Sequence, residues 1–203
     1  MLDQLPMIFA LIIALVMHEA AHGFASMILG DPTPGKLGRI TLNPLKHLDP
    51  LGTIFPALMI LTGSPFIFGW AKPVPVNPTY YKYPRKGFAI VAAAGPLVNF
   101  VLALIAAFLF RLLGEGLPNV IGVFLIYSTL INMILGCFNL LPVPPMDGSR
   151  IIQLFFPTQI ARKWFSLDRY GFAFVFLLIF FFRAPIDFAI GVAYSLAESL
   201  LGI

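Results

Sequence analysis

The chain has 203 residues, of which 59% are hydrophobic and only 11% are charged, and its mean hydropathy is +0.92. A soluble globular protein is about half apolar and about a quarter charged, so this chain could not cover its surface with polar groups in water. The composition therefore excludes an ordinary soluble globule. It predicts one membrane domain over residues 1–203, with the lipid bilayer as its surroundings.

Two further classes are excluded by composition. The formal net charge is only +4, and no basic run is interleaved with aromatic residues, so we expect no nucleic-acid partner. The one cysteine, Cys137, excludes an internal disulfide and a multi-cysteine metal cluster. It lies in an apolar run, where we interpret it as a small packing residue.

Apolar segments follow one another along most of the chain. A helix that crosses the hydrocarbon core needs about 20 apolar residues. The segments that approach this length are 5–29, 51–70, 87–113 and 119–141, followed by 170–182 and 185–203, which form one or two further spans. We therefore predict an all-α polytopic membrane protein with about four to six transmembrane helices.

The positions of the basic residues predict the orientation. Eleven of the thirteen Lys and Arg lie in three connections, at residues 36–46, 72–86 and 150–169. Short loops rich in Lys and Arg stay on the cytoplasmic side, so we expect a multi-pass protein of the cell membrane with these loops in the cytoplasm. Residues 51–70 must then enter and leave on one side. Because they contain Pro56, Gly63 and Pro65, we predict a re-entrant or extended segment around 51–80.

The first apolar segment contains the pattern H-E-x-x-H, formed by His18, Glu19 and His22. On a helix, positions i and i+4 share one face, so the two imidazoles can bind one metal ion. Glu19 is then within reach of a metal-activated water as a general base. The alternative is a chance match with polar residues packed on a neighbouring helix. Ionisable residues in a span cost roughly 2.5–3.5 kcal/mol each, which favours a metal as their partner.

A catalytic zinc site usually has three protein ligands, and two residues are candidates for the third. The remaining histidine, His47, lies in a basic loop, where a solvated or capping role is more typical. Asp147 follows an apolar span and the turn-rich stretch 142–146, and Gly148 comes directly after it. Its carboxylate could reach a metal on another helix, or it could cap the helix that begins near Gly148. Position alone leaves both roles of Asp147 open.

Three motifs in order resemble the site-2 protease family of intramembrane zinc metalloproteases, in its short form without PDZ or CBS domains. They are H-E-x-x-H at His18, Glu19 and His22, A-G-P-x-x-N at Ala94, Gly95, Pro96 and Asn99, and N-x-x-P-x-x-x-x-D-G at Asn139, Pro142, Asp147 and Gly148. The stretches 42–53 and 69–78 also resemble those of short bacterial and archaeal members. The similarity extends over about residues 11–152.

The resemblance implies a specific chemistry. His18, His22 and Asp147 would bind one Zn²⁺ per chain, and Glu19 would activate the water. The active site would lie within the membrane, towards the cytoplasmic side. The substrates would be transmembrane proteins or peptides, cut in or near their transmembrane segments during regulated intramembrane proteolysis or the clearance of signal-peptide remnants. We expect no attached regulatory domain.

Other polar and extended residues are candidates for substrate contacts. Asn139 could hold the oxyanion or the substrate backbone, the alternative being a helix-packing hydrogen bond. For Asn99, substrate contact and packing are equally open. The stretch Pro73, Val74, Pro75 and Val76 is extended by its prolines and could accept an unwound peptide by strand addition. The alternative for this stretch is an ordinary Pro-rich loop.

The main competing function is a membrane zinc carrier, or a protease-like fold that binds helices without cutting them. A transporter usually has ionisable residues on several helices along a path. Here the ionisable residues at depth are few and belong to the motifs, with Glu19 retained. We therefore predict a metalloprotease.

Overall fold

The computed structural model describes residues 4–50, 71–171 and 183–202, together with the single residues 52, 54, 58 and 181. Most of the predicted span 51–70 and most of 172–182 therefore lie outside the described residues. Within the described part the protein is helical, and its only β-type pairing is an isolated antiparallel bridge between Leu48 and Ala71.

Four described helices are long and apolar enough to cross a membrane, by length and composition. They are α1 (Leu5–Ile28), α4 (Pro84–Leu113), α5 (Asn119–Asn139) and α9 (Arg183–Leu201). These helices confirm the predicted all-α polytopic membrane fold. Prolines near the start of α1 and α4 suit the first helical turn, whose N–H groups have no partner within the helix.

Short helices connect the four spans. They are α2 (Thr33–Lys36), α6 (Asp147–Ile152), α7 (Thr158–Ser166) and the 3₁₀ turns η2 (Pro44–Lys46), η3 (Pro78–Tyr80), η4 (Gly114–Gly116), η5 (Gln153–Phe155) and η6 (Leu167–Tyr170).

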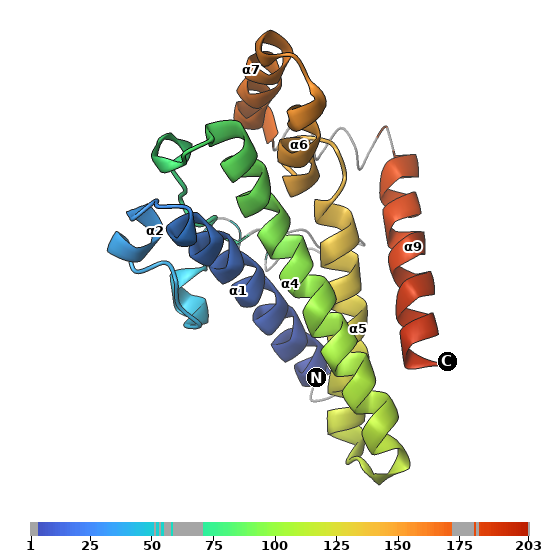
Figure 1. Cartoon of the computed structure of the whole chain (residues 1–203). Coiled ribbons are helices and arrows are strands. Elements are labelled where there is room, and N and C mark those ends of the chain that lie inside the picture. Colours follow the sequence, from blue (N-terminus) through green and yellow to red (C-terminus); the bar gives the residue numbers. More distant parts are fainter. Residues whose placement is uncertain are drawn as a thin grey trace.

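The spans pack through small residues. Helices α1, α4 and α5 pack against one another, and α9 packs against α5 and α4 (Figure 1). The buried hydrophobic residues are mostly alanines, among them Ala14 on α1, Ala103 on α4 and Ala193 on α9, whereas large side chains such as Phe108 face outward. This distribution is expected in lipid, where large apolar side chains gain little from burial and small residues let helices approach closely.

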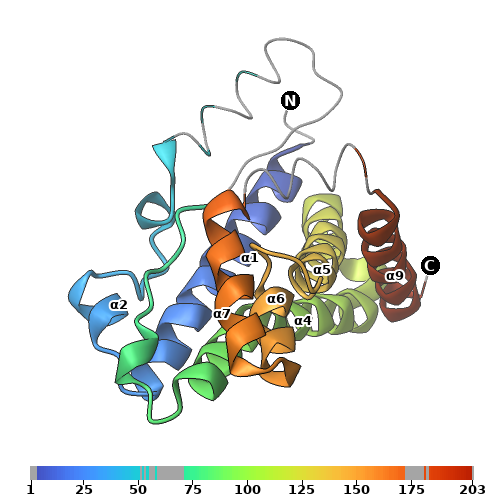
Figure 2. The ribbon, with the colours of Figure 1, turned by 90° about the horizontal axis from the view of Figure 1, so that it is seen from above.

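The long connections meet at one end of the bundle. Helix α1 ends where α4 begins, and α5 ends at the same level as the start of α9 (Figure 1). Figure 2 looks down on this end, where α2, α6 and α7 lie. The basic loops of the sequence are therefore gathered on one side, and the connection from α1 to α4 leaves and returns on that side.

Candidate metal centre

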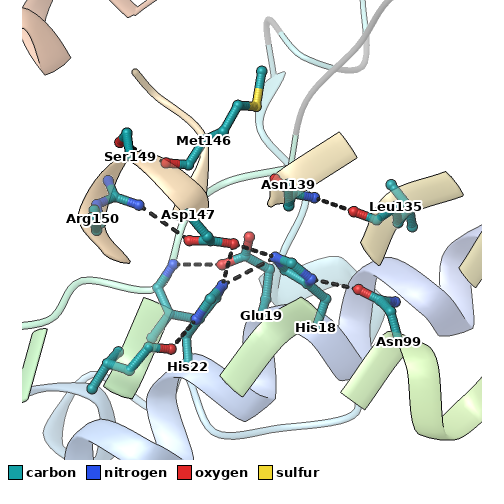
Figure 3. A network of polar contacts seen from close by, with 12 residues as sticks. His18, Glu19, His22, Asn99, Leu135, Asn139, Met146, Asp147, Ser149 and Arg150 are labelled. Atoms are coloured by element: carbon teal, nitrogen blue, oxygen red, sulfur yellow. Dashed lines mark hydrogen bonds and ion pairs between the residues drawn. The ribbon is translucent and has the colours of Figure 1, made fainter. Parts of the chain in front are cut away.

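Two histidines and one carboxylate converge near the loop-rich end of the bundle (Figure 3). His18 and His22 lie one turn apart on α1, with 3.0 Å between their Nε2 atoms. Asp147 Oδ2 is 3.3 Å from each of these nitrogens. The structure thus brings together the three residues that were predicted to bind metal.

Hydrogen bonds at Nδ1 leave the Nε2 atom of each imidazole, which faces Asp147, without a proton. His18 Nδ1 lies 2.6 Å from Asn99 Oδ1, and His22 Nδ1 lies 2.7 Å from the carbonyl oxygen of Val91. Both partners are oxygens that only accept hydrogen bonds, so in neutral rings both protons are on Nδ1 and the Nε2 atoms carry lone pairs. Two lone pairs and a carboxylate then face one point. Such an arrangement is unfavourable unless a cation occupies that point.

The distances fit a tetrahedral metal ion. Bonds of about 2.0–2.1 Å from zinc to His and Asp separate the ligand atoms by about 3.3–3.4 Å. The observed separations are 3.0, 3.3 and 3.3 Å. Three protein ligands leave a fourth position for water or substrate, as in catalytic rather than structural zinc sites.

The turn after α5 explains the position of Asp147. Met146, not Asp147, is the N-cap residue of α6, so the capping alternative for Asp147 is not observed. A Cβ atom on Gly148 would collide with the backbone of Leu140, so only glycine lets α6 begin this close to the end of α5. Arg150 Nη1 lies 3.3 Å from Asp147 Oδ1, which leaves Oδ2 directed at the histidines.

The contact with Arg150 also favours the ionised form of this carboxyl. A positive guanidinium 3.3 Å from Oδ1 stabilises the carboxylate relative to the neutral acid. The carboxyl is therefore ionised, and this is the form that binds metals.

Gly95 lets α4 pass directly beside the imidazoles. A Cβ atom there would lie 2.5 Å from His22 Nε2 and 2.6 Å from His18 Cε1. Sequence analysis identified Gly95 only as part of a motif, because its contact with the imidazoles depends on how α1 and α4 cross.

Glu19 lies beside the three candidate ligands, and its carboxylate is held by the backbone of the extended stretch 71–77. The Val74 N–H donates to Glu19 Oε2 at 2.8 Å. Glu19, the candidate ligands, Val74 and Asn139 all line one cavity of about 610 Å³. A base, a metal-binding cluster and space for a peptide are therefore found together.

The other predicted site residues are divided between the cavity and the protein interior. Pro73, Val74 and Val76 line the cavity, whereas Pro75 is exposed and does not. Asn139 lines the cavity and donates to Leu135 O, one turn earlier, at 3.0 Å.

Asn99 differs from the prediction of substrate contact. It is fully buried and lies outside the cavity lining. Its oxygen accepts from His18, and its amide nitrogen donates to Asn132 Oδ1 at 2.8 Å and to Ala14 O at 3.3 Å. All its polar atoms are used within the helix bundle, so the packing alternative describes its position.

His47 was expected to be solvated or capping, and it is buried and is the C-cap residue of η2. It is 3% exposed, and its Nε2 lies 2.9 Å from Thr41 O. Its backbone oxygen accepts from Lys72 N–H at 2.8 Å, so His47 supports the start of the extended stretch.

Two charged residues that the sequence did not single out hold the same stretch. Arg39 donates to Lys72 O at 2.6 Å and to Pro73 O at 3.1 Å. The Asn77 N–H donates to Asp31 Oδ2 at 2.6 Å. Arg39 belongs to a run of loop cations and Asp31 to a helix-ending turn, so no local signal in the sequence separates them from solvated charges.

Comparison with known proteins identifies relatives over most of the chain. The model of peptidase family M50 matches residues 116–182, a range that includes Asn139 and Asp147. The "Putative zinc metalloprotease YwhC" of Bacillus subtilis is 40% identical over 185 residues, which are 86% of this chain and 79% of that protein. The "Putative zinc metalloprotease Rip2" of Mycobacterium tuberculosis is 28% identical over 189 residues, which are 92% of this chain and 71% of that protein.

A shorter match joins the chain to an archaeal protein. The "Zinc metalloprotease MJ0392" of Methanocaldococcus jannaschii is 37% identical over 73 residues, which are 36% of this chain and 21% of that protein. No solved structure matches the chain significantly. Since the family model matches and a relative is 40% identical over most of both chains, the protein belongs to peptidase family M50, the site-2 protease family that its three motifs resemble.

Proposed function

We propose that this chain is an intramembrane zinc protease that hydrolyses peptide bonds in or near the transmembrane segments of membrane proteins, as a single domain over residues 1–203. One observation carries the proposal. Three metal-binding atoms converge beside Glu19 in a bundle of apolar helices. The relatives named as zinc metalloproteases support zinc as the metal. Suitable substrates arise in regulated intramembrane proteolysis and in the clearance of signal-peptide remnants.

His18, His22 and Asp147 would hold the zinc. When bound, zinc supplies a more acidic water and a polarised substrate carbonyl. The protein contributes ligands that are fixed before the metal arrives, because both imidazoles are held at Nδ1 and the carboxylate is held at Oδ1. Prearranged ligands keep the fourth position open for the reaction.

Glu19 is the general base. Its Oε2 accepts from the Val74 N–H, which orients the carboxylate and leaves Oε1 to take the proton from the attacking water. The same carboxyl can then deliver this proton to the departing amine.

Asn139 is the candidate oxyanion donor. A carboxamide has two N–H groups, and Leu135 O accepts from its nitrogen. One hydrogen therefore remains to stabilise the oxygen that becomes negative as the carbonyl is attacked. The position of Asn139 in the lining of the same cavity supports this role.

The stretch 73–76 is the candidate substrate strand. A peptide bond in a helix is shielded by its own hydrogen bonds, so the substrate must unwind, and its backbone then needs new partners. Pro73 and Pro75 have no N–H, and the Val74 N–H is used by Glu19. The Val76 N–H has no partner among the described residues, so it is available to a substrate carbonyl in strand addition.

The active site would face the cytoplasm. Helix α6, which begins at Asp147, lies at the end of the bundle where α2 and α7 also lie (Figures 1 and 2). Short basic loops remain cytoplasmic in membranes, which supports a multi-pass protein of the cell membrane with its cavity accessible to cytoplasmic water.

The test combines metal content with cleavage. In purified wild-type protein in detergent, we expect about one zinc per chain and cleavage of a model transmembrane substrate. The variant Glu19→Gln should keep the zinc, since it removes no ligand, and should lose cleavage, since an amide cannot take a proton. A well-folded wild type without metal, or an active Glu19→Gln, would contradict the proposal. Zinc flux into liposomes without cleavage would favour the carrier.

A further inference from the structure

A chain of buried hydrogen bonds connects His18 to the far side of the helix bundle. His18 on α1 contacts Asn99 on α4, and Asn99 contacts Asn132 on α5. Asn132 Nδ2 then donates to Ser128 O at 2.8 Å. His18, Asn99 and Asn132 are 6%, 0% and 2% exposed, so water does not compete for these contacts.

The donors and acceptors of this series of hydrogen bonds can be arranged in only one way. Ser128 O is a backbone carbonyl and can only accept, so the NH₂ end of Asn132 must face it. The Asn132 oxygen therefore faces Asn99 and requires the Asn99 NH₂ group at the 2.8 Å contact. The Asn99 oxygen is then left for His18 Nδ1, which must carry the proton. The Ser128 carbonyl thus determines, through Asn132 and Asn99, that His18 Nε2 keeps its lone pair. This lone pair is what allows His18 to bind metal.

Reversal of either amide would remove this ability. If Asn99 presented its NH₂ group to His18, Nδ1 would have to accept, and the ring proton would move to Nε2, where it blocks metal binding. The carbonyl of Ala14 also accepts from Asn99, but at a longer 3.3 Å. Asn132 is therefore the stronger of the two contacts that hold Asn99 in its orientation.

His22 has no such dependence. Its Nδ1 donates directly to the backbone carbonyl of Val91 at 2.7 Å, so no side chain can reverse its proton. The site thus holds one histidine directly by the backbone and the other by two asparagines.

We propose that Asn132 acts through Asn99 as a positioning residue that fixes the proton of His18 on Nδ1 and thereby sets the affinity of the site for zinc. The proposal rests on the proposed zinc site. No contact of Asn132 with the cavity is required, and Asn132 is absent from the cavity lining.

The first measurement is made on metal-free protein. The chain has only three histidines, so nitrogen-15 histidine labelling gives a spectrum in which each ring can be assigned and its protonated nitrogen identified. We expect His18 and His22 to carry the proton on Nδ1 in wild type. In Asn132→Leu, His18 should change towards the Nε2-protonated form while His22 does not. An unchanged His18 in this variant would overturn the proposal.

The second measurement is zinc affinity by competition with a chromophoric chelator. Loss of an outer partner of a metal-binding histidine usually weakens metal binding about 10–100-fold. We expect zinc to bind about 10-fold more weakly to Asn132→Leu than to wild type, because the Ala14 carbonyl still holds Asn99 in part. In Asn132→Asp, the buried carboxyl in its protonated form can donate to Ser128 O and still accept from Asn99, so affinity should stay within about threefold of wild type. Equal losses in both variants would indicate a packing role and overturn the proposal.

Two further variants test whether Asn132 acts on His18 through Asn99. Thr129 is equally buried on α5, but its hydroxyl donates only within its own helix, so Thr129→Val is the matched control and should bind zinc normally. Asn99→Leu should weaken binding as much as Asn99→Leu combined with Asn132→Leu, because Asn132 acts only through Asn99. Additive losses would contradict this route. If Asn132→Leu does not fold, Asn132→Ala removes the same acceptor with less steric demand.

The outcomes also separate this proposal from the proposed function. A wild type that binds no zinc would refute the metal site, and with it the effect on affinity, whereas the nitrogen spectrum would still decide whether Asn132 directs the His18 proton. A wild type that binds zinc and an Asn132→Leu variant that binds it equally well would refute only the role of Asn132.

Discussion

His18 and Glu19 are adjacent in sequence, yet the two sides of the site that they face are built in different ways. On the inner side, His18 and His22 contact α4, and their Nδ1 atoms are held by groups of a helix that packs along α1. On the outer side, Glu19 is held by one backbone N–H of the extended stretch 71–77. That stretch is itself held by side chains from the loop after α1, Arg39 and Asp31.

This difference separates metal binding from peptide handling. Packed transmembrane helices cannot shift one residue without disturbing a whole interface, so they suit ligands that must be fixed to within a fraction of an ångström. A loop held by individual hydrogen bonds can adjust to a peptide. We therefore expect changes on the inner side to alter zinc binding, and changes on the outer side to alter cleavage while zinc stays bound.

The largest effect is expected from Gly95→Ala on the inner side. The added methyl group would lie 2.5 Å from His22 Nε2, and the rings cannot move aside without losing their Nδ1 hydrogen bonds. Zinc affinity should fall by about 100-fold or more, beyond the usual effect of an outer partner. Chelator competition measures this fall.

Gly191→Ala is the control for this prediction, because a Cβ atom there meets nothing within 4 Å. Alanine is about 0.5–1 kcal/mol more favourable than glycine inside a helix, so a loss of zinc in Gly95→Ala cannot come from a weaker helix. Normal zinc binding by Gly95→Ala would mean that α4 is not held against the histidines as described.

A smaller effect is expected from Val76→Pro on the outer side. This change should lower the cleavage rate and not the zinc affinity. Proline removes the N–H that we assign to the substrate carbonyl, and a net hydrogen bond of about 0.5–1.5 kcal/mol corresponds to a roughly 2–12-fold lower cleavage rate. Zinc content should be unchanged, since no candidate ligand is held by a hydrogen bond from Val76. Cleavage kinetics and metal content measured on one preparation give both values.

Val76→Ala separates the backbone from the side chain, because alanine keeps the N–H and removes most of the apolar contact. If substrate pairs with this strand, Val76→Pro should be clearly slower than Val76→Ala. Equal rates for the two variants would count against strand addition at this position.

The two sides also differ in how far the sequence predicted them. Four apolar spans and the cluster of His18, His22 and Asp147 follow from hydropathy and motifs, because lipid imposes helix length and metal imposes ligand type. The residues that hold the cluster were not predictable in the same way. Asn99 was a candidate for substrate contact, and only the crossing of α4 with α1 shows that its oxygen is used by His18.

The outer side was predictable only in outline. The prolines of 73–76 predicted an extended chain. Residues 72–77 form no helix and no strand in the structure, so pairing of this stretch with a substrate stays a prediction. The partners of this chain come from far away in sequence and from residue types that are usually solvated. Arg39 looks like any cation of a basic loop, and its burial at 7% exposure depends on tertiary contacts that no local pattern encodes.

The smallest effect on the site is expected from Asp31→Asn. This change should alter how the stability of the protein depends on pH. Burial raises the pKa of Asp31, but hydrogen bonds from Thr33, Asn77 and Ser26 outweigh it, so the pKa lies below its usual value. A pKa that is lower in the folded state gives stability that is present above the unfolded value of about 3.9 and is lost as pH falls through the folded pKa. Asparagine has no such dependence.

Wild type should therefore be more stable than Asp31→Asn at pH 7, and the difference between their unfolding midpoints in detergent should shrink as pH is lowered below about 4. Other carboxyl groups and the histidines titrate in both proteins, so they cancel in this difference. Zinc content should match wild type at pH 7, because Asp31 holds Asn77 on the outer side and touches no candidate ligand. A difference that stays constant with pH would mean that Asp31 is not the ionised acceptor that fixes this end of the strand. A loss of zinc in Asp31→Asn would mean that the two sides of the site are coupled more tightly than their hydrogen bonds indicate.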